Sequence, residues 1–163
     1  MADGGASTMI MLVATLLISG AASAVLIDSW GDVVKTSNTN SKNERANSET
    51  GISFSGDLGD IELDTSGTNQ NITLFFQNTG TRILNATATS IFVDGNPATI
   101  LSKTIYPKSK IWAPNYVIEL VVSDSTWAYS DADLVKITTV VKSTVSGGVS
   151  GTDTVSQEVR LSV

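Results

Sequence analysis

An uncharged segment near the N-terminus constrains this chain more than any other feature. The 24 residues from Gly4 to Ile27 include no Asp, Glu, Lys or Arg. A helix of that length reaches about 36 Å, more than the hydrocarbon core of a membrane, which is about 30 Å thick. The segment also lacks the polar stripe of a buried globular helix. The sequence therefore predicts a helix that spans a membrane or forms the core of a helical assembly.

A cleaved signal peptide is the main alternative, because Ala22-Ser23-Ala24 has the small-x-small pattern of a cleavage site. Two features favour retention of the helix. No Lys or Arg precedes the uncharged segment, and the segment is longer than the hydrophobic region of a signal peptide, about 7–15 residues. We therefore expect residues 1–36 to form a retained transmembrane or filament-core helix.

Small residues within this segment suggest contact with another helix. Ser19 and Ser23 are four residues apart, and so are Gly20 and Ala24. This spacing places small side chains on one helix face, where a second backbone can approach closely. Glycine costs about 1 kcal/mol relative to alanine inside a helix, which close packing would offset. The alternative is that membrane helices tolerate glycine without such packing.

The rest of the chain changes from a polar stretch to a β-rich pattern. Residues 37–50 are polar apart from Ala46, and we expect a linker there because Asn, Ser and Thr are poor helix formers. An exposed extension of the helix is the alternative. From residue 51, short apolar segments alternate with turn residues, most clearly at 71–77, 87–93, 117–122 and 134–141. The fold class predicted is α+β, with an immunoglobulin-like all-β sandwich over residues 51–163.

Composition excludes several functions. The chain has no cysteine and no histidine, so disulfides, thiolate nucleophiles, Ser-His-Asp triads and the usual zinc sites are excluded. We expect no enzymatic activity, no catalytic residues and no cofactor. The net charge is −6 with only ten Lys and Arg residues, which argues against a nucleic-acid partner.

Four carboxylates lie between Asp57 and Asp64, at positions 57, 60, 62 and 64. Such oxygen-rich clusters suit calcium, but alternation with Ile61 and Leu63 also fits a solvated sheet face. We predict no metal site and retain calcium as the alternative. Asn71 and Asn85 each begin an N-x-T pattern and are possible glycosylation sites.

Two tryptophans, Trp112 and Trp127, fall in or near turns of the predicted sandwich. We expect Trp112 to cap its core. For Trp127, the core and a contact with a neighbouring subunit remain equal alternatives, since Trp dominates many protein interfaces.

Several segments together resemble a known family. They are Ser7–Ile27, Ile72–Leu84 (ITLFFQNTGTRIL), Phe92–Gly95 and Trp112–Asp124. Over most of its length the chain resembles the archaeal flagellin (archaellin) superfamily, and most closely its FlaG group of accessory proteins.

The resemblance implies a structural subunit of the archaellum, the archaeal flagellum. We expect a homo-oligomer formed through the N-terminal helix, with further contacts to other archaellum or envelope proteins and to the membrane. A FlaG-like accessory or stator subunit is the first expectation, because Gly4-Gly5 lacks the preceding basic residue of archaellin precursors. A filament-forming archaellin or type IV pilin-like subunit is the alternative. The head would lie outside the cytoplasm, on a membrane anchor or in an extracellular filament.

Overall fold

The computed structural model describes residues 4–163 and divides into two compact units between Lys42 and Asn43. The first unit is helical. The second contains the end of the same helix and all the strands. Residues 1–3, the start of the helical segment predicted over 1–36, lie outside the described residues.

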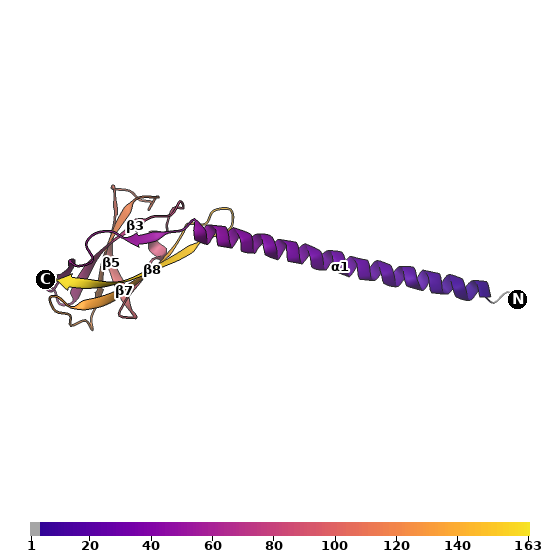
Figure 1. Ribbon diagram of the computed structural model, residues 1–163, viewed down its shortest axis with the longest axis horizontal. Helices are drawn as coiled ribbons and strands as arrows, with labels where there is room; N and C mark the ends of the chain where they lie inside the picture. The colour runs from indigo at the N-terminus through magenta and orange to yellow at the C-terminus, as the bar shows by residue number, and fades with distance from the viewer. Residues whose placement is uncertain (1–3) are drawn as a thin grey trace. The chain divides into compact units, whose positions relative to one another are not determined.

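The helix α1 (Gly4–Ser48) is 45 residues long and unbroken, as its ribbon in Figure 1 shows. The predicted long N-terminal helix is thus confirmed. Residues 37–48, expected as a linker, are helical instead. The Thr39 hydroxyl donates to the carbonyl of Lys35 at 3.0 Å, and the Ser48 hydroxyl donates to that of Arg45 at 2.9 Å. These hydroxyl groups bond to carbonyls of their own helix, which is how Ser and Thr are accommodated inside it.

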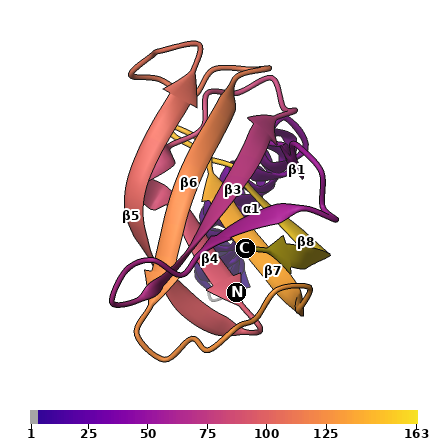
Figure 2. The ribbon, with the colours of Figure 1, turned by 90° about the vertical axis from the view of Figure 1, so that its left-hand side faces the viewer.

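Eight strands form the second unit. They are β1 (Ile52–Phe54), β2 (Ile61–Asp64), β3 (Gln70–Asn78), β4 (Ser90–Val93), β5 (Asn96–Tyr106), β6 (Val117–Asp124), β7 (Leu134–Lys142) and β8 (Thr152–Ser162). A short 3₁₀ helix, η1 (Ala86–Ala88), precedes β4. The sheet order is β1-β3-β2-β8-β7-β4-β5-β6, and β3 also pairs with β6. The pairing therefore closes on itself, and Figure 2 shows β5, β6 and β3 side by side.

The closed pairing corrects the predicted immunoglobulin-like sandwich to a barrel-like ring. Two strands, β5 and β2, join the sets of strands on either side of them. β5 pairs with β4 over Asn96–Ala98 and with β6 from Thr99 onwards, and its register shifts between Ile100 and Ser102. β2 pairs antiparallel with β3 and parallel with β8. A bulge increases strand twist, which lets one strand belong to two walls of the barrel.

The core lies inside this ring. Side chains that alternate along the strands are fully buried, among them Leu74, Phe76, Ile118 and Leu120. Trp112 is also fully buried, and its indole N–H donates to the carbonyl of Tyr116 at 2.9 Å. The predicted core position of Trp112 is confirmed. Its polar atom is satisfied, as burial of an indole requires.

Candidate assembly surfaces

The helix residues predicted to pack against another helix all lie on an exposed surface. Ser19, Gly20, Ser23 and Ala24 are exposed, as is every other residue of α1 before Ala46 for which burial is described. A Cβ added at Gly20 would meet nothing within 4 Å. No contact within the described chain therefore requires a glycine at this position. The packing role of this face remains a prediction.

Several hydroxyl groups of the uncharged segment bond to carbonyls of the helix itself. The Thr15 hydroxyl donates to the carbonyl of Met11 at 2.7 Å, and the Ser23 hydroxyl donates to that of Ser19 at 2.8 Å. In lipid or in a dry bundle an unsatisfied polar group costs several kcal/mol. These bonds avoid that cost for the hydroxyl groups of Thr15 and Ser23 in an apolar environment.

The apolar surface of α1 extends beyond the uncharged segment. Leu17 and Ile27 are 69% and 73% exposed, and Trp30, Val33 and Val34 are still more than half exposed. Mean hydropathy reaches 2.4 in this helix, which is long and apolar enough to cross a membrane. Large contiguous apolar surfaces mark contact with a membrane or another protein. We therefore identify residues 5–34 as the apolar surface of the first unit that a membrane or another protein would bury.

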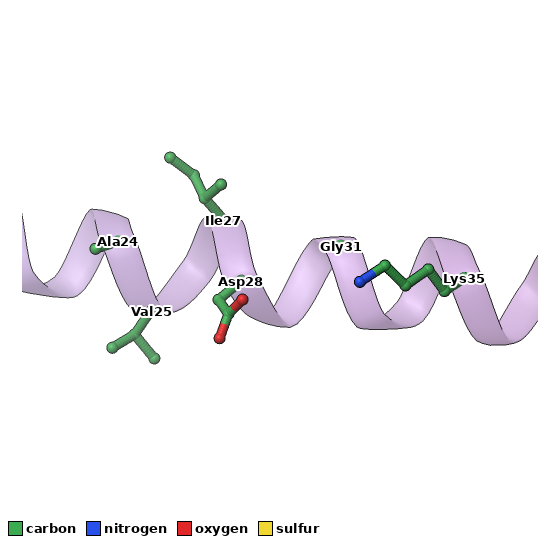
Figure 3. A pocket seen from close by; sticks show the side chains of 6 residues that line it. All are labelled: Ala24, Val25, Ile27, Asp28, Gly31 and Lys35. Atoms are coloured by element: carbon green, nitrogen blue, oxygen red, sulfur yellow. The ribbon is translucent and has the colours of Figure 1, made fainter.

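A shallow hollow lies where the uncharged segment ends. Figure 3 shows its lining by Ala24, Val25, Ile27, Asp28, Gly31 and Lys35. Ala24 and Gly31 are seven residues apart and share one helix face with Asp28, so the hollow arises from missing side-chain volume. Asp32 and Lys35 form an exposed ion pair at 4.0 Å, which contributes little to stability.

The last turn of α1 belongs to the second unit and is held by it. Ala46 is fully buried, and the Asn47 side-chain oxygen accepts from the backbone N–H of Thr152 at 3.0 Å. A Cβ added at Gly151 would overlap the carbonyl of Ala46. Only glycine permits this close approach between the helix end and β8.

Three charged side chains add to the contact between the end of α1 and the head. The Glu49 carboxylate binds Arg45 at 2.7 Å and Arg82 at 3.4 Å. Its pKa is lowered, chiefly by the hydrogen bond from Arg45. The Arg82 guanidinium also donates to the carbonyl of Val149 at 3.1 Å. Sequence reasoning missed Arg82 and Glu49, which are separated by more than thirty positions and belong to no local pattern.

The acidic residues between Asp57 and Asp64 do not converge on one point. Asp57, Asp60 and Glu62 line a small hollow beside Phe75, whereas Asp64 accepts hydrogen bonds from the backbone and hydroxyl of Ser66. The Ser66 hydroxyl bond is the main cause of a lowered Asp64 pKa. Across residues 4–163, no group of three or more acidic side chains is placed to hold a metal ion.

The two possible glycosylation sites differ in environment. Asn71 is half-buried within β3, between Asp64 of β2 and Ser123 of β6. Asn85 precedes η1, and its side-chain oxygen accepts from the Thr87 backbone and hydroxyl at 3.0 and 2.7 Å. Modification of either residue remains a prediction.

Trp127 lies in a loop that is fastened to the barrel. Its ring packs partly on the core and lies 5.9 Å from that of Tyr129. Gln70 bonds both the N–H and the carbonyl of Tyr129, at 2.8 and 2.7 Å. Burial, followed by the hydrogen bond to Asp94 at 2.9 Å, raises the Tyr129 pKa to about 12. The loop is thus a structural element, and no local pattern predicted Gln70 or Asp94 as its partners.

These features define a class of protein. A long helix with an exposed apolar surface, joined to a β-rich head, defines proteins whose helix is covered by a membrane or by other subunits. The model of the archaeal-type flagellin family matches residues 2–163, and the chain belongs to that family. No curated protein matches it.

Membership defines the general role. The family is structural and non-enzymatic, so the chain is a structural subunit of the archaellum and takes part in motility. The family assembles into the archaellum filament with an N-terminal helix, and its members are extracellular in the filament or anchored in the membrane. The exposed apolar helix is consistent with both locations.

Proposed function

We propose that this chain is a filament-forming archaellin whose N-terminal helix packs against the helices of other copies. The observation that carries the proposal is the length of the exposed apolar surface. It continues past Ile27 through Trp30, Val33 and Val34, although a span of about 20 apolar residues already crosses a bilayer. Copies of the same helix would cover this additional surface.

Within that assembly, we propose that the face of Ser19, Gly20, Ser23 and Ala24 is where neighbouring helices approach most closely. The four-residue spacing of Ser19 and Ser23, and of Gly20 and Ala24, supports this assignment. Small residues allow backbone approach and van der Waals packing, which drive helix association where no hydrophobic effect operates.

A FlaG-like accessory subunit is the second candidate. It is favoured by Trp30, which is 69% exposed and lies three residues beyond Ile27. An indole at that place fits the membrane–water interface. In this role the helix stays in lipid as far as Ile27, and the head contacts other envelope proteins.

Electron microscopy of the purified full-length protein after detergent removal separates the candidates. Ordered helical filaments made of this chain alone would support the archaellin. Oligomers that remain in lipid vesicles without forming filaments would support the accessory subunit. A protein that stays monomeric and free of lipid would contradict both.

A further inference from the structure

Three charged residues interrupt the apolar surface of α1 after Ile27. They are Asp28, Asp32 and Lys35, and all three are exposed, as are the apolar side chains beside them. A bundle of helices that covers those apolar side chains also takes nearby charges out of water. A carboxylate that loses water without gaining a cation is costly. The position of each charge therefore limits how neighbouring helices can pack.

Asp28 has no cation on its own helix within reach. Ion pairs along a helix join residues three or four positions apart, and those positions around Asp28 hold Ala24, Val25, Gly31 and Asp32. Asp32 carries the same charge, and like charges four residues apart repel each other. Among the ion pairs found within residues 4–163, none includes Asp28. A cation for Asp28 in a dry bundle therefore has to come from outside its own helix.

Lys35 supplies the nearest positive charge on this face. It is the first Lys or Arg of the chain and follows Asp28 by seven residues, so two helical turns bring it back to nearly the same face. Its ion pair with Asp32 spans 4.0 Å between side chains that are 83% and 76% exposed, which makes the pair weak. Figure 3 shows the Lys35 side chain directed back toward Gly31. Its ammonium group can therefore bind a second carboxylate on this face.

The shallow hollow between these two charges leaves room for a second helix. Ala24 and Gly31 line it, and a Cβ added at Gly31 would meet nothing within 4 Å. Asp28 and Lys35 line the same hollow and carry opposite charges two turns apart. The face is therefore complementary in charge to a copy of itself that is displaced along the helix axis.

We propose that Asp28 of one α1 forms an ion pair with Lys35 of α1 in a second copy, and that this pair sets the axial stagger between the two helices. Seven residues correspond to about 10 Å along a helix, so parallel neighbours would be displaced by about that distance. Each copy offers Asp28 to one neighbour and Lys35 to another, and such a heterologous contact continues into an open array. The inference rests on the proposed function, since it requires helices of this chain to pack together.

The other basic residues of α1 fit this role less well. Lys42 and Arg45 follow Asp28 by 14 and 17 residues, so they would require displacements of about 21 and 26 Å. Displacements of that size would leave less than half of the uncharged segment, which is about 36 Å long, beside its neighbour. Arg45 also binds Glu49 at 2.7 Å. Lys35 is therefore the cation that pairs with Asp28 at the smallest loss of apolar contact.

Charge reversal in the full-length protein tests the ion pair, with filament formation measured after detergent removal. Asp28→Lys and Lys35→Asp each place like charges at the contact. Each should need a concentration about tenfold higher than wild type for assembly, a change equivalent to about 1.4 kcal/mol. The double variant that combines them restores opposite charges at every contact and should assemble near the wild-type concentration. Asp32→Lys changes the net charge as much as Asp28→Lys does, and as the matched control it should have a smaller effect.

Disulfide trapping measures the stagger and leaves both charges in place. The chain has no cysteine, so introduced thiols report only the designed contact. A stagger that places Asp28 opposite Lys35 also places Ala24 opposite Gly31, since both pairs are seven residues apart. When Ala24→Cys and Gly31→Cys proteins are mixed, assembled and oxidised, we expect a crosslinked dimer containing one of each. Helices packed without a stagger would crosslink each variant with itself, because a disulfide needs Cα atoms within about 7 Å.

The outcomes separate this inference from the proposed function. Wild-type protein that never forms filaments overturns the proposed function and, with it, the ion pair. Wild-type filaments together with unimpaired single reversals overturn the ion pair alone. So does a folded double variant that is not rescued, an Asp32→Lys protein as defective as Asp28→Lys, or cysteine variants that crosslink only with themselves. Circular dichroism of each variant establishes that it is folded.

Discussion

The two units of this chain use apolar residues in opposite ways. In the head, alternate strand residues such as Leu74 and Ile118 are fully buried. In the helix, residues of the same type, such as Leu17 and Ile27, are about 70% exposed. Burial within the chain stabilises the head by itself, at about 25 cal/mol per Å² of apolar surface. The helix can gain this stabilisation only from lipid or from other subunits, so its sequence encodes assembly rather than a monomeric fold.

The largest expected effect compares truncations in the two units. Phe76→Ala should lower the free energy of unfolding of the head by about 3–5 kcal/mol, because it leaves a cavity in a closed core. Leu17→Ala should change it by less than about 0.5 kcal/mol, since Leu17 is an exposed residue of the other unit. Urea unfolding of the detergent-solubilised protein, followed by tryptophan fluorescence, measures both. A large effect of Leu17→Ala on head stability would contradict the comparison.

The substitution of alanine for one glycine in each unit sharpens the comparison between the head and the helix. Gly151→Ala introduces a Cβ against the carbonyl of Ala46 and should destabilise the head by about 1–3 kcal/mol. Gly20→Ala meets open space and should favour the helix by about 1 kcal/mol. Thermal unfolding measures the first effect, and helix content by circular dichroism measures the second.

A larger side chain at Gly20 tests the role of this helix face in assembly. Gly20→Leu should leave the head stable but weaken assembly. If Gly20→Leu assembles as well as wild type, that helix face is not the contact.

Asn85 and Asn71 make a smaller comparison inside the head. We expect a glycan on Asn85 rather than Asn71, because Asn85 lies in a turn and Asn71 is half-buried in a strand paired on both sides. Asn85→Ala should remove the glycan mass from protein expressed in an archaeal host and cost about 1 kcal/mol through loss of the cap. Intact-mass spectrometry measures whether Asn85→Ala has lost the glycan. A glycan retained by Asn85→Ala and lost from Asn71→Ala would reverse the assignment.

The smallest expected effect concerns the pH dependence of stability that comes from Glu49, directly after the end of α1. Its pKa is lowered in the folded protein, chiefly by Arg45. The stabilisation is therefore present above the unfolded-state value of about 4.3 and is lost as pH falls through the folded-state pKa. Melting temperatures at neutral and acid pH should fall less for Glu49→Gln than for wild type. Equal losses in both proteins would show that this ion pair does not contribute.

Several features of the molecule followed from local sequence. The uncharged run from Gly4 to Ile27 was enough to predict the helix, because desolvation of the backbone in an apolar environment leaves few alternatives. Alternation along 71–77 and 117–122 predicted two central strands, since side chains of a strand point to opposite faces. Trp112 was correctly predicted to lie in the core. These signals depend on neighbouring residues and need no knowledge of distant contacts.

Only the tertiary structure decided how these elements close. β2 pairs with the C-terminal strand, Glu49 binds Arg82, and Gln70 holds Tyr129 through contacts that span many positions of the chain. The barrel-like ring replaced the predicted sandwich because β2 joins β3 to β8, β5 joins β4 to β6, and β6 pairs with β3. The helix continued to Ser48 although its composition predicted a linker, and its last turn is held by the second unit, where Ala46 is buried and Asn47 accepts from the N–H of Thr152. Local propensities are worth less than about 1 kcal/mol per residue, and contacts between distant residues outweigh them.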